Sequence, residues 1–233
     1  MSLAPRLATV RLDSVPPQPW RNGGGSTREL FTWPGGAAPW QLRISVADIS
    51  QDGPFSAFDG VDRWFAVLQG AGVRLGLAGG LQALDVHSPP LQFAGEQAPG
   101  CWLTDGPTRD LNLMLQRGAG QACMLPVVPG EAWQHPAPLR ALLTTTPVQL
   151  QIDDQPALPV GAWTLALAGA ASRQHWTLAN PAGALPAGQR ACWLAFTPAP
   201  NANGSSYAHI VLTDDATAGG PARSVTNLVH FTV

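Results

Sequence analysis

The sequence contains no lysine: all 13 basic residues are arginine, and they stand against 15 acidic residues, for a formal net charge of -2. Charged residues make up only 12% of the chain and form no basic run. Surfaces that bind nucleic acid or anionic membranes carry dense positive charge, so we expect neither partner. The arginine bias also suits bidentate capture of carboxylates, although a biased genome composition is an equally simple explanation.

Long hydrophobic runs and a disulfide pattern are absent too. No apolar run reaches the length of a membrane span, and the N-terminal sequence MSLAPRLATVRLD has no hydrophobic signal core. Cys101, Cys123 and Cys192 are far apart and form no CxxC motif. We therefore expect reduced cysteines in the core of a soluble, cytoplasmic protein.

The motifs of the common catalytic sites are missing. The 5 histidines form no HxH or HExxH pattern, and the chain has no GxSxG motif. Metal sites and nucleophilic triads need such ligands or partners, so the sequence predicts no metal, no cofactor and no activated serine. His87 is expected at the exposed end of a strand.

What the chain does contain is short strand-like runs, separated by many of its 25 glycines and 23 prolines. We find no amphipathic helix of three turns, and this pattern predicts an all-β fold. Strands are expected over 8–15, 26–33, 72–77, 83–88, 91–96, 100–106, 109–117, 139–153, 158–168, 173–179 and 190–198. The Pro-rich segment 127–138 predicts a boundary between an N-terminal half, 1–127, and a C-terminal half, 128–233.

The most informative stretch runs from Trp40 to Gly70 and predicts a strand, a turn-rich loop and a second strand. In its first strand Arg43 and Ser45 alternate with apolar residues. Alternate side chains point to opposite faces, so one face lies on a core and the other meets water or a polar cavity. Arg63 opens the second strand.

A second polar strand face is expected over residues 109–117. Arg109 shares one face with three leucines, whereas Asp110 and Asn112 share the other with Met114. Acidic and amide side chains on one face are suited to line a pocket, as are Arg43 and Ser45.

The Gly-rich stretch around Gly23–Gly25 has two interpretations. Such a loop can hold a phosphate, but only with a helix N-terminus behind it, and here a strand-like run follows. We therefore favour a turn whose backbone angles suit glycine. Its neighbours Trp20, Arg21, Asn22 and Arg28 are loop residues of the kind that border sites.

Two arginines have carboxylates close by in the sequence. Asp59 and Asp62 lie near Arg63, and Asp105 and Asp110 lie near Arg109. One interpretation is structural ion pairs at strand ends, and surface pairs of this kind contribute at most about 1 kcal/mol. The other is that the carboxylates fix arginines that face a small acidic ligand. Of the 9 tryptophans, most are expected in the core, with one or two on a cavity wall.

Three stretches taken together resemble the HutD/Ves family: PWRNGGGSTREL, WQLRISVADISQDGPFSAFDGVDRWFAVLQG and GPTRDLNLMLQR, in that order. The resemblance covers roughly residues 8–195, and the segment after about residue 197 looks like an extension. It implies a cupin-type fold, with two antiparallel β-barrel or jelly-roll halves in one chain (a bicupin). Cupins often hold a metal through His and Glu, a pattern that this chain lacks.

The resemblance also implies a regulatory role in histidine utilisation, through binding of formylglutamate, and links a related branch to cold and stress response. No firm enzymatic activity is attached to the family. Its shared polar positions match Trp20, Arg21, Asn22, Arg28, Arg43, Ser45, Phe55, Ser56, Arg63, Asp105, Arg109, Asp110 and Asn112. We take these as the candidate ligand-binding residues.

Three hypotheses follow. In the first, a regulatory protein binds a small carboxylate metabolite such as formylglutamate, with Arg43 and Arg63 pairing the carboxylate. In the second, a cupin enzyme, an isomerase or hydrolase, uses Asp105 or Asp110 as general acid or base on a small acidic metabolite. In the third, the polar strand faces only meet water. The apolar content is also compatible with a homodimer.

Overall fold

The computed structural model of the chain describes residues 7–35, 39–169, 174–179 and 185–200, and the backbone of strands β20 (Ile210–Val211) and β21 (His230–Phe231). Within these residues the fold is all-β, as predicted, with two three-residue 3-10 helices, η1 (Leu12–Ser14) and η2 (Gly95–Gln97). None of the helices in the described part of the chain is long and apolar enough to span a membrane. The expected C-terminal extension lies largely outside the described residues.

The N-terminal half is built from two antiparallel sheets. The six-stranded sheet has the order β2 (Gln18–Pro19), β3 (Gly25–Trp33), β4 (Leu42–Ile49), β11 (Thr108–Gln116), β6 (Val61–Gln69) and β9 (Leu91–Ala94). The four-stranded sheet has the order β5 (Gly53–Pro54), β10 (Gly100–Leu103), β7 (Val73–Leu77) and β8 (Gly80–Leu84). The long strands β4, β11 and β6 lie at the centre of the larger sheet.

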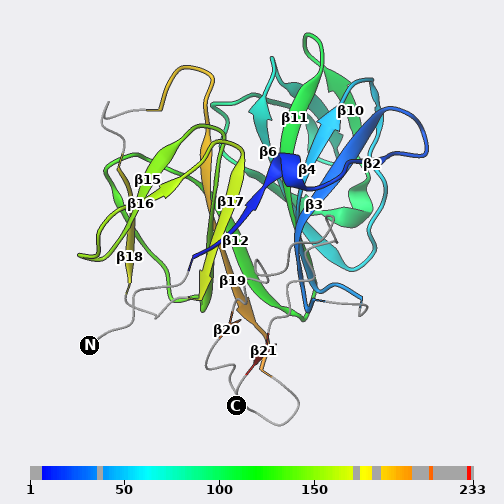
Figure 1. Cartoon of the computed structure of the whole chain (residues 1–233). Coiled ribbons are helices and arrows are strands. Elements are labelled where there is room, and N and C mark those ends of the chain that lie inside the picture. Colours follow the sequence, from blue (N-terminus) through cyan, green and yellow to red (C-terminus); the bar gives the residue numbers. More distant parts are fainter. Residues whose placement is uncertain are drawn as a thin grey trace.

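The C-terminal half repeats this plan. Its five-stranded sheet has the order β1 (Ala8–Arg11), β17 (Thr164–Gly169), β14 (Leu139–Thr144), β19 (Ala191–Pro198) and β12 (Gly120–Pro126). Its four-stranded sheet has the order β13 (Ala132–Gln134), β18 (His175–Ala179), β15 (Val148–Ile152) and β16 (Leu158–Val160). Figure 1 shows β15, β16 and β18 on one side of the molecule and β4, β6 and β11 on the other, with β17, β12 and β19 between them.

Three apolar clusters hold these sheets together. One, with Phe65 and Leu75, fills the space between the two sheets of the N-terminal half. A second, with Leu150 and Trp176, does the same in the C-terminal half. The largest cluster, which includes Leu111 of β11, lies between the six-stranded and five-stranded sheets. Each central sheet therefore has both faces buried, and the two halves share one core.

Each half was expected to be a β-barrel or a jelly roll, and the described strands do not form closed barrels. Each half is a sandwich of two open sheets, whose end strands do not pair with one another within the described residues. Strands β1 and β12, on the N-terminal side of the proposed boundary at 127, pair with β17 and β19 of the C-terminal half. The division into domains at this point stays a prediction, and these two strands cross it.

Tryptophans fill much of the C-terminal half. The rings of Trp133 and Trp193 stack with centroids 5.1 Å apart, and Trp176 meets both rings edge-on at 6.1 Å. Offset and edge-to-face contacts of this kind add to the stability gained from burial. Of the 9 tryptophans, four are buried, namely Trp33, Trp64, Trp176 and Trp193, so the expectation that most of them lie in the core is not met.

Several predicted strands end earlier than expected, and for two of them the structure shows the reason. Residues 12–14 form helix η1 instead of extending β1, and the backbone N–H of Leu12 donates to Trp163 O. The predicted strand 83–88 ends at Leu84, because the Asp85 carboxylate accepts the backbone N–H groups of His87 and Ser88 and closes a turn. The segment 127–138, predicted as a break, contains the short strand β13.

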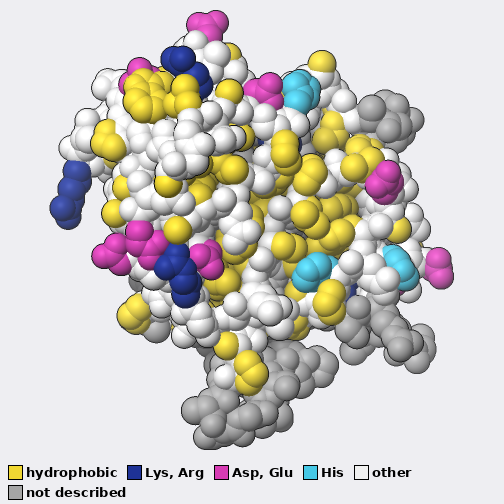
Figure 2. Space-filling model, turned by 180° about the vertical axis from the view of Figure 1, so that it is seen from behind, with side chains coloured by type: hydrophobic (Ala, Val, Ile, Leu, Met, Phe, Trp, Pro, Cys, Tyr) yellow, Lys and Arg dark blue, Asp and Glu magenta, His cyan; other side chains and the backbone are white. Residues whose placement is uncertain are grey.

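The low charge density of the sequence is visible on the surface. On the rear face, hydrophobic side chains gather across the middle, while most charged groups lie nearer the edges (Figure 2). Within the described residues the large hydrophobic side chains exposed to solvent are Leu81, Trp102, Leu125 and Val128. The three cysteines are free, as predicted, and Cys101 and Cys192 are buried.

Candidate ligand pocket

A cavity of about 480 Å³ opens on the face of the six-stranded sheet that points away from the C-terminal half. Strands β3, β4, β6 and β11 form its floor, and segments 19–22 and 54–58 form its rim and opposite wall. Nine of the thirteen residues singled out from the sequence line it: Trp20, Arg21, Asn22, Arg43, Ser45, Phe55, Ser56, Arg63 and Asn112.

The strand register explains why these side chains meet. Arg43, Met114 and Arg63 are direct neighbours on β4, β11 and β6. Ser45 and Asn112 form the next pair on the same face, two residues along β4 and β11. Adjacent strands lie about 4.8 Å apart, so each row places polar groups across a span that a small molecule can fill.

Arg63 is the most unusual side chain of the pocket. It is only 6% exposed, and its Nε and Nη2 donate to Asn112 Oδ1 at 2.9 and 2.6 Å. Its guanidinium lies 4.5 Å from the ring centroid of Phe55 and 5.4 Å from that of Phe93. Burial, and then the nearby Arg43 charge, lower the pKa of Arg63. No carboxylate of the described residues pairs with it.

Arg43 is partly neutralised. Its Nε lies 2.9 Å from Glu29 Oε2, an ion pair in which the N–H does not point at the oxygen well enough for a hydrogen bond. The Glu29 side chain is 38% exposed, so water screens this pair and limits its strength to about 1 kcal/mol. Arg43 therefore remains able to contribute positive charge to the pocket.

Asn112 and Ser45 complete a group of donors. Asn112 Oδ1 accepts two bonds from Arg63, so the other end of the amide carries the N–H donors. The Ser45 hydroxyl lies beside it and also lines the cavity. Donors from Arg63, Asn112, Ser45 and Arg43 thus border one cavity, a composition that suits an anion.

Asp110 lies on the same face of β11, but it is buried and is not among the lining residues. The side chain is fully buried, Oδ2 accepts from Thr108 Oγ1 at 2.8 Å, and Oδ1 has no hydrogen-bond partner among the described residues. Burial raises the pKa of Asp110 to about 8. The carboxyl is therefore protonated at neutral pH.

The Gly-rich stretch forms a tight turn at the rim. Gly25 begins strand β3, so no helix N-terminus stands behind the glycines. A Cβ on Gly25 would lie 2.3 Å from Asp48 O and 3.1 Å from the Trp20 ring, so only glycine fits there. Trp20 is held in place by its Nε1, which donates to Thr27 Oγ1 at 2.8 Å. The turn thus positions the rim of the pocket.

Arg28 and Arg109 lie on the opposite face of the same sheet. They bracket Asp48, with Arg28 Nη1 2.5 Å from Oδ2 and Arg109 Nε 2.6 Å from Oδ1. Arg109 also lies 4.6 Å from the ring centroid of Trp163, a residue of the C-terminal half. The two arginines link β3 and β11 to β4, and Arg109 also links the two halves of the molecule. This agrees with the interpretation of these charges as structural ion pairs.

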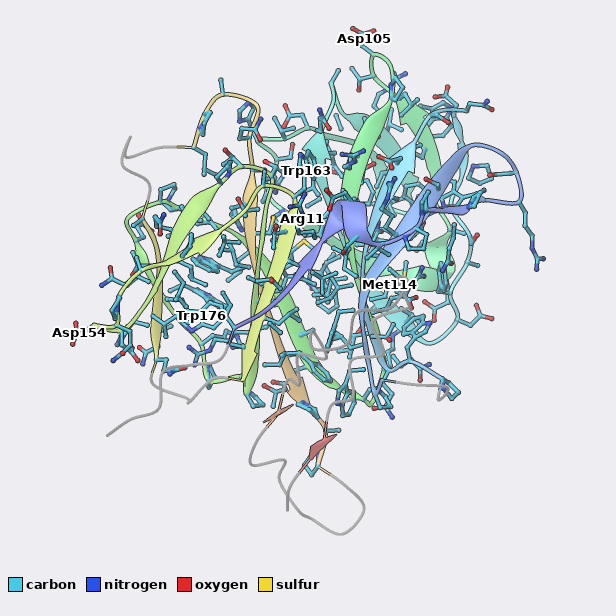
Figure 3. The ribbon with its side chains drawn as sticks, viewed as in Figure 1. Arg11, Asp105, Met114, Asp154, Trp163 and Trp176 are labelled. Atoms are coloured by element: carbon cyan, nitrogen blue, oxygen red, sulfur yellow. The ribbon has the colours of Figure 1, made fainter. Side chains whose placement is uncertain are left out.

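Asp105 lies in an exposed turn (Figure 3), far from Met114 on the pocket floor. We therefore leave Asp105, Arg28 and Arg109 out of the proposed binding site. Sequence reasoning missed several lining residues, which are mostly apolar: Pro19, Thr27, Ala47, Ile49, Pro54, Phe58, Phe65 and Met114. Strand alternation had placed Met114 on the same face as Asn112, and that signal, followed further, would have found Ala47 and Phe65 too.

No group of three or more His, Cys, Asp or Glu side chains in the described residues is arranged to hold a metal ion. Among the described residues a close Cys–His contact occurs beside the five-stranded sheet, where Cys123 Sγ of β12 lies 3.6 Å from His135 Nε2. His135 Nδ1 accepts the backbone N–H of Ala137. Nε2 therefore carries the proton of the neutral ring and cannot accept one from the thiol.

Comparison with known proteins gives a family. The model of the HutD family matches residues 13–179. An "uncharacterized 21.2 kDa protein in hutC 3′ region" of Pseudomonas putida is 38% identical over 110 residues, or 47% of this chain and 58% of that protein. Protein Ves of Citrobacter koseri is 37% identical over 105 residues, or 44% of this chain and 54% of that protein. The matched region therefore spans little more than half the length of these curated relatives.

Solved structures extend the comparison. HutD from Pseudomonas fluorescens is 26% identical, with a TM-score of 0.70, over 83% of this chain and 99% of that one. An oxalate decarboxylase from Bacillus subtilis, at 9% identity and a TM-score of 0.52, matches 84% of this chain and 78% of that one. This second likeness concerns the fold alone and shows that the all-β fold is cupin-like.

Proposed function

The chain belongs to the HutD family, and we propose that it binds a small carboxylate metabolite, of which formylglutamate is an example, in the pocket of its N-terminal half. We further propose that its two sandwiches are two cupin-like halves and that the bound metabolite has a regulatory role. The binding step is the part that the geometry supports best.

Arg63 carries the proposal. A guanidinium keeps its charge, and burial without a counter-charge is costly. Among the described residues Arg63 has a neutral amide and two aromatic rings as partners but no carboxylate, so it favours an incoming anion. The hydrogen bonds to Asn112 fix the plane of the guanidinium before a ligand arrives. A planar carboxylate matches this arrangement because two of its oxygens can face two N–H groups at once.

The walls of the pocket indicate what the carboxylate is attached to. Phe55, Phe58 and Pro54 face the donors from the opposite side. A volume of about 480 Å³ is in the range of small-molecule sites and leaves room for a short carbon chain beyond the anionic group. HutD from Pseudomonas fluorescens has been solved in a formate condition, and formate is the smallest carboxylate.

The enzyme hypothesis is less well supported. It gave Asp105 or Asp110 the role of general acid or base, but neither lines the pocket. A group that transfers a proton to a substrate must come within hydrogen-bond reach of it, directly or through one water. We therefore place binding first.

Calorimetric titration at about pH 7 tests the proposal, with N-formyl-L-glutamate and formate as ligands and the wild type against Arg63→Met. Removing one partner of a desolvated charge pair costs about 2–5 kcal/mol, so the variant should bind at least roughly 30-fold more weakly. Arg74→Met is the matched control, because Arg74 is an exposed strand arginine outside the pocket.

Circular dichroism and thermal unfolding establish that each variant is folded. If Arg63→Met does not fold, Ser45→Ala on the pocket floor provides a milder test, with a loss of about 10-fold expected for one hydrogen bond to a charged group. Wild-type protein that gives no heat with either ligand would falsify the proposal. Unchanged binding in a folded Arg63→Met variant would mean that the ligand binds at another site.

A further inference from the structure

We propose that above neutral pH the pocket takes up one proton together with each anion it binds, and that Asp110 holds this proton. The inference rests on the proposed function, since it concerns the same pocket, but it assigns Asp110 a role that is distinct from touching the ligand. Asp110 is a positioning residue here, because it sets the charge that Arg63 presents.

The position of Asp110 is the first part of the argument. It precedes Asn112 by two residues on the same face of β11, and its neighbours across the sheet are Ala47 and Val67. The side chain is sealed from solvent, with a single hydrogen bond from Thr108 and an Oδ1 atom without a partner among the described residues. An ionised carboxylate would be poorly stabilised in this place.

The second part is a count of charges. Among the described residues, Arg63 attracts the Asp110 carboxylate electrostatically, although the two form no ion pair. A bound carboxylate would lie against the same guanidinium. Either Asp110 or the ligand can therefore supply the counter-charge of Arg63, and two negative charges around one buried positive charge repel each other.

The other charged groups around Asp110 do not change the conclusion that Asp110 and the ligand compete to be the counter-charge of Arg63. Asp48, on the far face of β4, adds a negative charge that disfavours ionised Asp110. On β10, the Cys101 thiol has a pKa of about 12, raised first by burial, and stays protonated. Arg43 adds positive charge on the Arg63 side. Burial lowers the pKa of Arg63 to about 9. A delocalised guanidinium nevertheless keeps its proton in a folded protein, so the titrating group is the Asp110 carboxyl.

The proton balance follows. Below a pH of about 8, the free protein already holds the Asp110 proton, and an anion binds without proton exchange. Above it, binding takes one proton from the solvent, which forms the O–H bond of Asp110 while the ligand replaces the carboxylate as the counter-charge of Arg63. The affinity then falls by up to about tenfold for each pH unit.

Calorimetry between about pH 6.5 and pH 9.5, in buffers of different ionisation enthalpy, measures both affinity and proton uptake. The titrants are N-formyl-L-glutamate and formate. We expect constant wild-type affinity up to about pH 7.5, a drop of roughly tenfold between pH 8.5 and 9.5, and uptake that approaches one proton. Asp110→Asn should bind equally over the whole range, and the exposed-carboxyl control Asp105→Asn should follow the wild type.

The outcomes separate the two proposals. No binding of either titrant at any pH overturns the proposed function, and the proton coupling with it. Binding without proton uptake, or a pH dependence that persists in Asp110→Asn, overturns the coupling alone. If Asp110→Asn fails to fold, carbon-13 NMR of the wild-type Asp110 carboxyl replaces it. Formate must then move the titration of this carboxyl to higher pH, and an unchanged titration refutes the coupling.

Discussion

The replacement Asp110→Asn makes a sharp prediction about stability. In the folded protein the carboxyl holds its proton up to a pH of about 8, whereas its ordinary pKa is 3.8. Because the pKa is raised on folding, stability is fully present below the lower value and is lost as the pH rises toward the higher one. Wild-type protein should therefore become less stable between about pH 4 and pH 8.

The magnitude follows from the shift. Each pH unit in this window removes about 1.4 kcal/mol, so the contribution of Asp110 to the free energy of unfolding falls by about 3 kcal/mol from pH 5 to pH 7.5. The asparagine does not titrate and lacks this slope. Its amide N–H groups lie in a buried site whose neighbouring polar group, the Thr108 hydroxyl, is itself a donor. These N–H groups stay unsatisfied, which lowers the free energy of unfolding by about 1–3 kcal/mol at every pH. This cost is the same at every pH, so it lowers the unfolding free energy of the variant without changing how that free energy depends on pH.

Urea unfolding followed by tryptophan fluorescence, at several pH values between about 5 and 8, measures the effect. The window avoids Glu96, whose pKa is lowered to about 2, first by its hydrogen bond to Arg117. The difference in unfolding free energy, variant minus wild type, should rise steadily with pH. Parallel curves for the two proteins would refute the reasoning, since they would mean that Asp110 is ionised in the folded protein at neutral pH.

Two further predictions concern the frame around the pocket. Arg190→Met should cost about 2–4 kcal/mol in urea unfolding, because the buried guanidinium donates to four backbone carbonyls of the N-terminal half, which would be left unsatisfied; a loss below about 0.5 kcal/mol, the range expected for Arg74→Met, would contradict this. Gly25→Ala should cost more than about 1 kcal/mol and weaken anion binding, because its Cβ would collide with Asp48 O and displace the Trp20 ring. Unchanged binding in a folded Gly25→Ala variant would show that the rim does not shape the site.

The strands of the pocket floor were predictable because local rules govern them. Arg43 and Ser45 alternate with apolar residues, and the structure places them on β4 with one face in the shared core and the other on the cavity. The same holds for Asn112 and Met114 on β11. A strand with one buried apolar face fixes the direction of every side chain, so alternation alone separates the two faces.

The same rule placed Arg109 on the leucine face of its strand, opposite Asn112, but it could not identify the partners of Arg28 and Arg109. Both are arginines near polar stretches, yet they lie on the far face of the sheet, where Asp48 pairs with both. Their partner comes from a different strand, and the aromatic contact of Arg109 comes from Trp163 in the other half. Contacts between segments so distant in the sequence depend on strand order, which no local pattern specifies.

Periodicity and long motifs are properties of consecutive residues, so an all-β chain, the polar strand faces and the family could be predicted without a structure. Tertiary structure alone decided the rest. The register of β4, β11 and β6 brings Arg43, Arg63 and Asn112 to one cavity. Burial raises the pKa of Asp110, and Arg63 has no ion-pair partner among the described residues. Charge states of this kind arise from what surrounds a side chain in space, and only the folded chain supplies those surroundings.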